Sequence, residues 1–136
     1  MTPKHKGDIA MSHAIHFYMT RGYEVCLPIG DKSDYDIVVE KNGALEKIQV
    51  KYGGLYPNKT GCRVALRVMG GNQSYHYAKK YSDSAFDILF VYTAKDELFE
   101  IPWAEIKVRS ELSVETPKYQ KYKKSMSRVT QVANEG

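Results

Sequence analysis

The sequence has few cysteines and no long apolar run. Its 136 residues include two cysteines, Cys26 and Cys62, which are too few and too far apart for a zinc motif, and we expect two buried thiols. No run approaches the roughly 20 apolar residues of a membrane span. Lys4, Lys6 and Asp8 come too early for a secretory leader. We therefore expect one cytoplasmic domain over residues 1–136 with no membrane partner.

Acidic residues are absent between Lys47 and Lys80. This window holds seven basic residues, although the net charge is only +4. The tail is basic again, and we treat residues 114–136 as a basic C-terminal extension. A polyanion such as nucleic acid suits both windows, because each Lys or Arg that meets a phosphate releases counterions. A solvated surface that happens to be positive explains the composition equally well.

Other binding motifs are also missing. Gly53 and Gly54 open no phosphate-binding loop, because no Gly-Lys-Ser/Thr follows them. His13 and His16 have a spacing that permits a metal pair, but they lack a third nitrogen or sulfur ligand. We therefore interpret the two histidines as surface or packing residues.

What the sequence does contain is a strong hairpin signal. Asn42-Gly43 separates two β-branched runs and predicts a two-residue hairpin loop. Counting back along both strands from this loop places Asp36 opposite Gln49, with their Cβ atoms about 5 Å apart. Lys51 lies two residues further along and points to the same face. The hairpin thus predicts that a carboxylate, an amide and an ammonium converge.

This group of side chains favours metal-assisted chemistry on a phosphodiester. The carboxylate of Asp36 and the amide oxygen of Gln49 are hard ligands suited to Mg²⁺, for which Mn²⁺ can substitute. The Lys51 ammonium could hold an attacking water or offset charge that develops on the phosphate. The alternative is an ordinary solvated strand face with Asp36 at its edge.

Hydrophobic patterning predicts an α/β domain with a mixed central sheet. The expected elements are a helix over 8–20, a strand over 23–28, the hairpin over 35–51, a strand over 62–68, a short helix over 72–81, a buried strand over 85–93, its partner over 98–101 and a helical turn over 102–106.

Alternation over residues 62–68 predicts the strand that contacts DNA. Arg63, Ala65 and Arg67 share one of its faces, and Lys59 lies just upstream. Val64, Leu66 and Val68 share the other face, which we expect to pack on the core. The other predicted DNA contacts are Tyr75, Lys79, Lys80 and Lys121. Tyr75, Tyr77 and Tyr81 suit core packing equally well, and the tail suits an ordinary exposed helix.

The order of Asp36, a hairpin and Gln49-Val50-Lys51 resembles the core motif of the PD-(D/E)XK nuclease superfamily, with Gln in place of the usual acid. The similarity extends over roughly residues 6–106, from the opening of the first helix to the later strands at 87–92. Within this superfamily, the chain resembles the small endonuclease group that includes cyanobacterial group I intron homing endonucleases. Archaeal Holliday-junction resolvases share the same core.

The resemblance implies a restriction-endonuclease-like αβββαβ core flanked by helices. It further implies a bacterial or phage-encoded, Mg²⁺-dependent endonuclease that leaves 5′-phosphate ends on double-stranded DNA. Asp36 and Gln49 would bind the metal, the Val50 carbonyl would complete the shell, and Lys51 would act on the nucleophile. One motif cuts one strand, so we expect a homodimer or homotetramer. A homing endonuclease is the leading expectation, and a junction resolvase is the alternative.

One position departs from the family pattern. Relatives carry a metal-binding Glu on the first helix where this chain has Met11, and a thioether is a poor Mg²⁺ ligand. Asp8 lies one turn earlier on the same helical face and supplies a carboxylate in one interpretation. In the other it is an acid favoured by the dipole at the start of the helix. If nothing replaces the Glu, the chain is a DNA-binding module that has lost cleavage.

Overall fold

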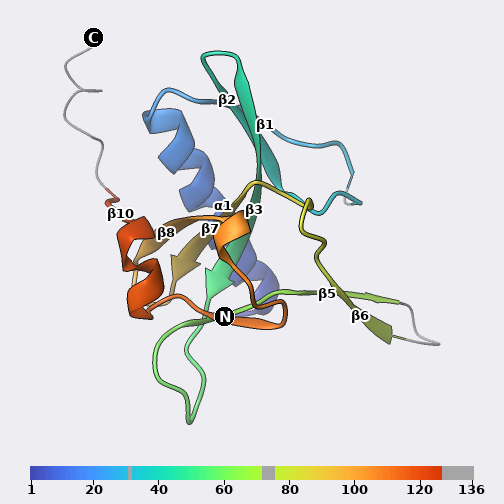
Figure 1. Cartoon of the computed structure of the whole chain (residues 1–136), viewed down its shortest axis with the longest axis vertical. Helices are drawn as coiled ribbons and strands as arrows, with labels where there is room; N and C mark the ends of the chain where they lie inside the picture. Colours follow the sequence, from blue (N-terminus) through green and yellow to red (C-terminus); the bar gives the residue numbers. More distant parts are fainter. Residues whose placement is uncertain (31, 72–75, 127–136) are drawn as a thin grey trace.

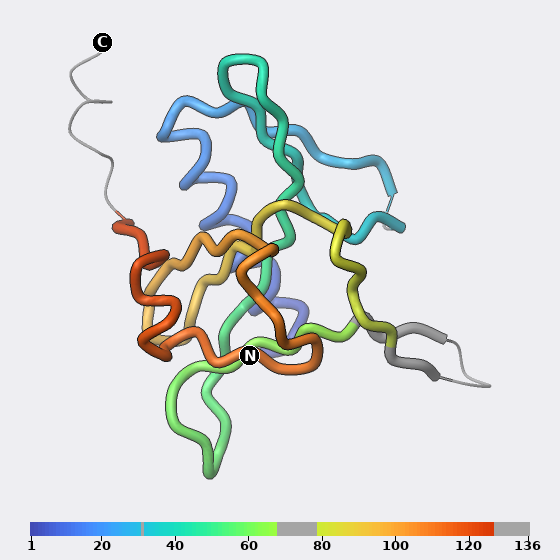
Figure 2. The backbone as a smooth tube through the Cα atoms, viewed as in Figure 1, coloured from blue at the N-terminus to red at the C-terminus, as the bar shows by residue number. Residues whose placement is uncertain are grey.

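Over the residues that it describes, the computed structural model has one main sheet, a long helix packed against it and two small two-stranded sheets (Figures 1 and 2). It describes residues 1–30, 32–71 and 76–126. The predicted DNA contact Tyr75 lies outside these ranges.

The helix α1 (Pro3–Thr20) starts earlier than the predicted residue 8. Thr2 caps it, since its side-chain oxygen accepts the His5 backbone N–H at 3.1 Å, and Pro3 occupies the first position. Asp8 therefore lies inside the helix rather than in its first turn, and the helix-dipole interpretation of Asp8 was wrong.

The main sheet is mixed, as predicted. β3 and β7 pair in parallel, and every other neighbouring pair is antiparallel. The strands, in spatial order, are β1 (Glu24–Cys26), β2 (Ile37–Lys41), β3 (Ala44–Gly53), β7 (Ile88–Thr93), β8 (Leu98–Pro102) and β10 (Lys123–Lys124). The buried strand expected from residue 85 is β7, which begins at Ile88, and it lies between β3 and β8.

The two faces of the sheet are covered differently. α1 covers one face, where Phe90 of β7 packs on Phe17 and Tyr18 at ring-centroid distances of 5.4 and 5.9 Å. The other face is covered by the 3-10 helices η1 (Trp103–Glu105) and η2 (Pro117–Tyr122) together with residues 62–66 and 112–114. The alternation along β7 thus supplies two cores, one to each side.

The strand predicted over residues 62–68 is divided in two. β4 (Arg63–Ala65) pairs with β9 (Glu111–Ser113), whereas β5 (Arg67–Gly71) pairs with β6 (His76–Lys80). Leu66 lies between β4 and β5, is fully buried, and donates its N–H to the Ser110 carbonyl at 2.9 Å.

The short helix predicted over residues 72–81 was wrong for its described part, because His76–Lys80 form the strand β6. Polar and aromatic residues suit a short strand as well as a helix, and pairing with β5 satisfies the backbone. Figure 1 shows β5 and β6 extending away from the main sheet.

The described part of the predicted C-terminal extension packs on the domain. Val114 and Tyr119 are buried in the core, and Lys123–Lys124 pair with β8. Cys62 is buried, but Cys26 is exposed, so the expectation of two buried thiols was wrong for Cys26. None of the helices in the described ranges has the length and apolar character to cross a membrane.

Candidate active site

The predicted hairpin register is confirmed along the β2–β3 ladder. Partners run from Lys41 and Ala44 at the loop to Ile37 and Ile48 at the far end. The loop Asn42-Gly43 has φ values of 56° and 84°, the left-handed geometry that a two-residue turn requires. The register thus places Asp36 just before Ile37, at the end of the paired strands that is farthest from the loop.

Asp36 itself leaves the ladder. Its N–H donates to the Ile48 carbonyl at 2.9 Å instead of pairing with Gln49, and its Oδ2 accepts the Val50 N–H, also at 2.9 Å. The prediction that Asp36 stands directly opposite Gln49 was therefore wrong, although the Gln49 amide does lie 3.3 Å from Oδ2 of Asp36. The carboxylate is fixed over the β3 backbone by a hydrogen bond that the chain supplies locally.

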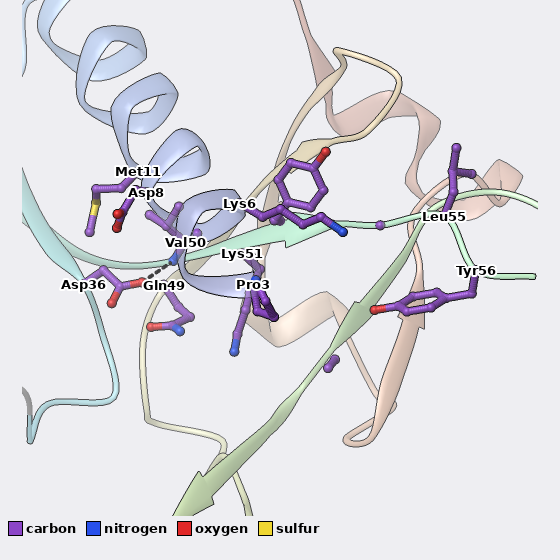
Figure 3. A pocket seen from close by; sticks show the side chains of 14 residues that line it. Pro3, Lys6, Asp8, Met11, Asp36, Gln49, Val50, Lys51, Leu55 and Tyr56 are labelled. Carbon is purple, nitrogen blue, oxygen red and sulfur yellow. Dashed lines mark hydrogen bonds between the residues drawn. The ribbon is translucent and has the colours of Figure 1, made fainter. Parts of the chain in front are cut away.

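A cavity of about 610 Å³ opens between the first turns of α1, β3 and the chain that follows β3 (Figure 3). It brings together all the predicted catalytic and metal-binding residues from separate parts of the sequence. Its lining residues are Pro3, Lys6, Gly7, Asp8, Met11, Asp36, Gln49, Val50, Lys51, Tyr52, Gly54, Leu55, Tyr56 and Ala65.

Gln49 is only 8% exposed, and both ends of its carboxamide have polar neighbours. One end lies 3.1 Å from the hydroxyl of Tyr81. The other end lies 3.3 Å from Oδ2 of Asp36 and 2.8 Å from the Asp34 carbonyl. This second end faces oxygens only, so it suits an amide N–H, or an amide oxygen that shares a cation with them.

Asp36 and Lys51 are partly desolvated charges of opposite sign. Burial raises the pKa of Asp36, while the Val50 N–H and the Lys51 charge partly lower it. Burial lowers the pKa of Lys51, and the nearby Asp36 charge opposes this shift. The Lys51 ammonium also lies 5.4 Å from the centre of the Tyr81 ring, which stabilises its charge. Both charged groups are thus held at the cavity without full hydration.

The α1 wall of the cavity carries Met11 and Asp8, which Figure 3 shows on the side of the helix near Asp36. Met11 is partly buried and packs against the core under α1. The Asp8 side chain is 65% exposed and pairs with Lys4 at 3.3 Å. This wall thus offers one carboxylate, held only by an exposed ion pair.

The donor set fits a hard cation rather than zinc. Within the described ranges, no three His, Cys, Asp or Glu side chains gather as a metal site. The cavity instead offers the Asp36 carboxylate, the Gln49 amide and main-chain carbonyls, with Asp8 on the α1 wall. Mg²⁺ is commonly held by one or two carboxylates, with waters and substrate phosphates completing its octahedron. These residues therefore fit Mg²⁺ or Mn²⁺.

Two of the predicted DNA contacts are paired with an acid. Lys59 lies 2.7 Å and Arg63 lies 3.7 Å from the same oxygen of Glu111. The segment from Lys47 to Lys80 contains no acidic residue of its own, but pairing of β4 with β9 brings Glu111 next to it.

The other described contacts lie elsewhere on the surface. Arg67, Lys79 and Lys80 are exposed on β5 and β6, whereas Lys121 is exposed on η2. None of the six described contacts lines the cavity. The structure thus gathers the predicted catalytic residues but not the predicted DNA contacts.

The sequence did not predict that two residues near Gln49, Tyr81 and Asp34, contribute to the site. Tyr81 is buried as one interpretation expected and packs on Phe86 and Trp103, but its hydroxyl also reaches the site. The Asp34 carbonyl is the second. No periodicity marks either residue, because both are brought to Gln49 by the path of the chain.

Comparisons with known proteins agree with this geometry. A bacterial homing endonuclease superposes with a TM-score of 0.67 and 27% identity, covering 89% of this chain and 84% of that one. Protein 5.3 of Escherichia phage T7 is 31% identical over 115 residues, 84% of this chain and 92% of the relative. The six-stranded mixed sheet with α1 is a restriction-endonuclease-like fold. Residues 1–132 match the PD-(D/E)XK endonuclease family, so the chain belongs to this nuclease family.

Proposed function

We propose that the protein is a metal-dependent endonuclease that hydrolyses phosphodiester bonds of double-stranded DNA in this cavity. The observation that carries the proposal is that Asp36, Gln49 and Lys51 all line the same cavity. A homing endonuclease with the same fold supports DNA as the substrate.

The metal ligands that we propose are Asp36, Gln49, the Val50 carbonyl and Asp8. When bound, Mg²⁺ or Mn²⁺ would act as a Lewis acid on the phosphate and lower the pKa of a bound water. Asp36 suits this role because its carboxylate is oriented by the Val50 N–H before any ligand arrives. Asp8 is the acid that would replace the family Glu absent at Met11.

Lys51 would act on the substrate directly. Its ammonium projects into a partly desolvated cavity, where a positive charge interacts more strongly with a phosphate than it does in water. The ammonium would hold the attacking water or stabilise the charge that develops on the phosphate oxygens. We expect the reaction to leave 5′-phosphate and 3′-hydroxyl ends.

The DNA would extend from the cavity toward β5 and β6. Arg67, Lys79 and Lys80 are exposed there and would meet backbone phosphates. Lys59 and Arg63 would contribute after exchanging Glu111 for phosphate. Each chain has one such cavity in its described part, so cutting both strands would need a homodimer or homotetramer, which would also lengthen a specific target. The phage relative is compatible with action in the bacterial cytoplasm.

The second candidate is a DNA-binding protein that does not cut. Met11 favours it, because a thioether replaces a carboxylate on the α1 wall of the cavity. This alternative predicts salt-sensitive DNA binding and no metal-dependent product.

Cleavage of a supercoiled plasmid library with random inserts separates the two candidates. Wild type, Asp36→Ala and Lys51→Ala are compared in Mg²⁺, Mn²⁺ and chelator, with Lys107→Ala as a control because Lys107 is exposed and outside the cavity. We expect nicked and linear DNA from wild type and the control only. Equal DNA binding by all four proteins, with no product in either metal, would contradict the nuclease and favour the binding protein.

A further inference from the structure

Tyr81 belongs to the core cluster on the sheet face opposite α1, and its hydroxyl contacts the candidate site. It precedes β7, is 6% exposed and packs edge-on against Phe86 and Trp103 at centroid distances of 5.2 and 6.1 Å. Its hydroxyl lies 3.1 Å from the Gln49 carboxamide, yet Tyr81 does not line the cavity. Tyr81 therefore contacts Gln49, a proposed metal ligand, from the core side and not from the cavity where substrate would bind.

The Gln49 carboxamide fits its surroundings in either of two orientations, which differ in their hydrogen bonds. With its nitrogen toward the cavity, it donates to Oδ2 of Asp36 at 3.3 Å and to the Asp34 carbonyl at 2.8 Å. With its oxygen there, three oxygens face one another, an arrangement that needs a cation between them. The amide nitrogen then points away from the cavity and donates to the Tyr81 hydroxyl at 3.1 Å.

The hydroxyl of Tyr81 satisfies the amide in both orientations. A phenol both donates and accepts, so it gives a hydrogen to the amide oxygen in one orientation and accepts the amide N–H in the other. Without it, the amide oxygen loses its partner in the first orientation, and the amide N–H loses its partner in the second. A buried N–H without an acceptor is tolerated less well than a buried carbonyl oxygen without a donor, so the loss falls mainly on the orientation that turns the oxygen toward a cation. Phe is thus a poor replacement even though its ring fills the same space.

We propose that Tyr81 is a positioning residue that lets Gln49 turn its amide oxygen toward a divalent cation at Asp36 and turn it back when the cation leaves. This rests on the proposed metal-dependent function. In the absence of a cation, the amide N–H groups cap the Asp36 carboxylate and the Asp34 carbonyl. On cation binding, the inner hydrogen bond is kept with its direction reversed.

The hydroxyl and the ring of Tyr81 can be tested separately. The ring lies 5.4 Å from the Lys51 ammonium, and Tyr81→Phe keeps this contact while it removes the hydrogen bond. Tyr119→Phe is the matched control, because Tyr119 is buried in the same core cluster and loses the same atom. Thermal unfolding of both variants shows that each remains folded.

The primary measurement is Mn²⁺ binding by calorimetry in the absence of DNA. We expect the dissociation constant to rise about tenfold in Tyr81→Phe and to stay within about twofold of wild type in Tyr119→Phe. The same dissociation constant in Tyr81→Phe and wild type would overturn the proposal, as would wild type that binds no Mn²⁺.

A double-mutant cycle with Gln49→Glu tests orientation itself. A carboxylate presents an oxygen at either end, so no amide needs to be turned. We expect Tyr81→Phe to change Mn²⁺ affinity by less than about twofold when it is combined with Gln49→Glu. An equal tenfold loss with and without Gln49→Glu would assign Tyr81 a packing role and overturn the proposal. Tyr81-dependent Mn²⁺ binding by a protein that cuts no DNA would keep this inference and overturn only the nuclease.

Discussion

At the scale of single residues, Asp36 has opposing demands. Metal binding in the proposed function would need its carboxylate ionised, whereas burial raises its pKa and thus favours the protonated form. The folded protein therefore holds this proton at higher pH than the unfolded chain does. The stability contributed by the protonated carboxyl is present at low pH and is lost as the pH rises through the folded-state pKa.

The substitution Asp36→Asn tests how ionisation of this carboxyl group affects stability and cleavage. An Asn side chain keeps an oxygen for the Val50 N–H and removes the ionisation, so the free energy of unfolding at pH 7 should not fall below that of wild type. Cleavage should fall by about 100-fold or more, because a neutral amide replaces the charged carboxylate that we propose as the main metal ligand. Chemical denaturation and plasmid cleavage measure the two effects. A variant that is clearly less stable than wild type would contradict this account of the Asp36 environment.

Met11→Glu tests whether the missing acid limits activity. Met11 lines the cavity beside Asp8, so a carboxylate there would add a ligand on the α1 wall. We expect the Mg²⁺ concentration for half-maximal cleavage to fall by about tenfold, a gain of roughly 1.4 kcal/mol. Met19→Glu is the control, because Met19 is 61% exposed on the same helix and outside the cavity. An unchanged metal requirement would show that Asp8 already supplies what relatives obtain from Glu.

At the scale of elements, β5 and β6 carry the exposed charges that we assign to DNA. Arg67 of β5 pairs in register with Lys80 of β6, so basic residues lie together where the two strands leave the domain. Lys59 and Arg63, by contrast, share Glu111. This arrangement makes β5 and β6, rather than β4, the main candidate for phosphate contact.

Removing two of these charges should weaken DNA binding without altering chemistry. We expect Lys79→Ala/Lys80→Ala to reduce the slope of log affinity against log salt concentration by about 2, since each lost phosphate contact contributes about 0.9. A mobility-shift titration at several salt concentrations measures this slope, with Lys107→Ala as control. A slope equal to that of wild type would show that the DNA passes elsewhere.

At the scale of the whole molecule, one cavity in the described part of each chain sets the pattern of cutting. If a homo-oligomer cuts a duplex, a mixed assembly with one active and one Asp36→Asn subunit should cut one strand only. We expect nicked circles to accumulate as the proportion of Asp36→Asn rises in refolded mixtures, measured by gel electrophoresis. Linear DNA in unchanged ratio to nicked circles would show that one chain cuts both strands in turn.

The sequence by itself determined what depends on neighbouring residues. Asn42-Gly43 dictated the hairpin because few residues adopt two successive positive φ angles, and this turn set the β2–β3 register. The register in turn predicted that Asp36, Gln49 and Lys51 would meet. The alternation of residues 62–66 likewise predicted which side chains are buried.

Only the tertiary structure decided what depends on distant segments. His76–Lys80 are a strand because β5 offers them a partner, which local propensity does not reveal. Glu111 forms ion pairs with Lys59 and Arg63 because β4 pairs with β9, which lies far along the chain. The hydroxyl of Tyr81 reaches Gln49 across 32 positions, and no pattern predicts such a contact. Hydrogen bonds and ion pairs depend on positions in space, and packing sets those positions for residues distant in sequence.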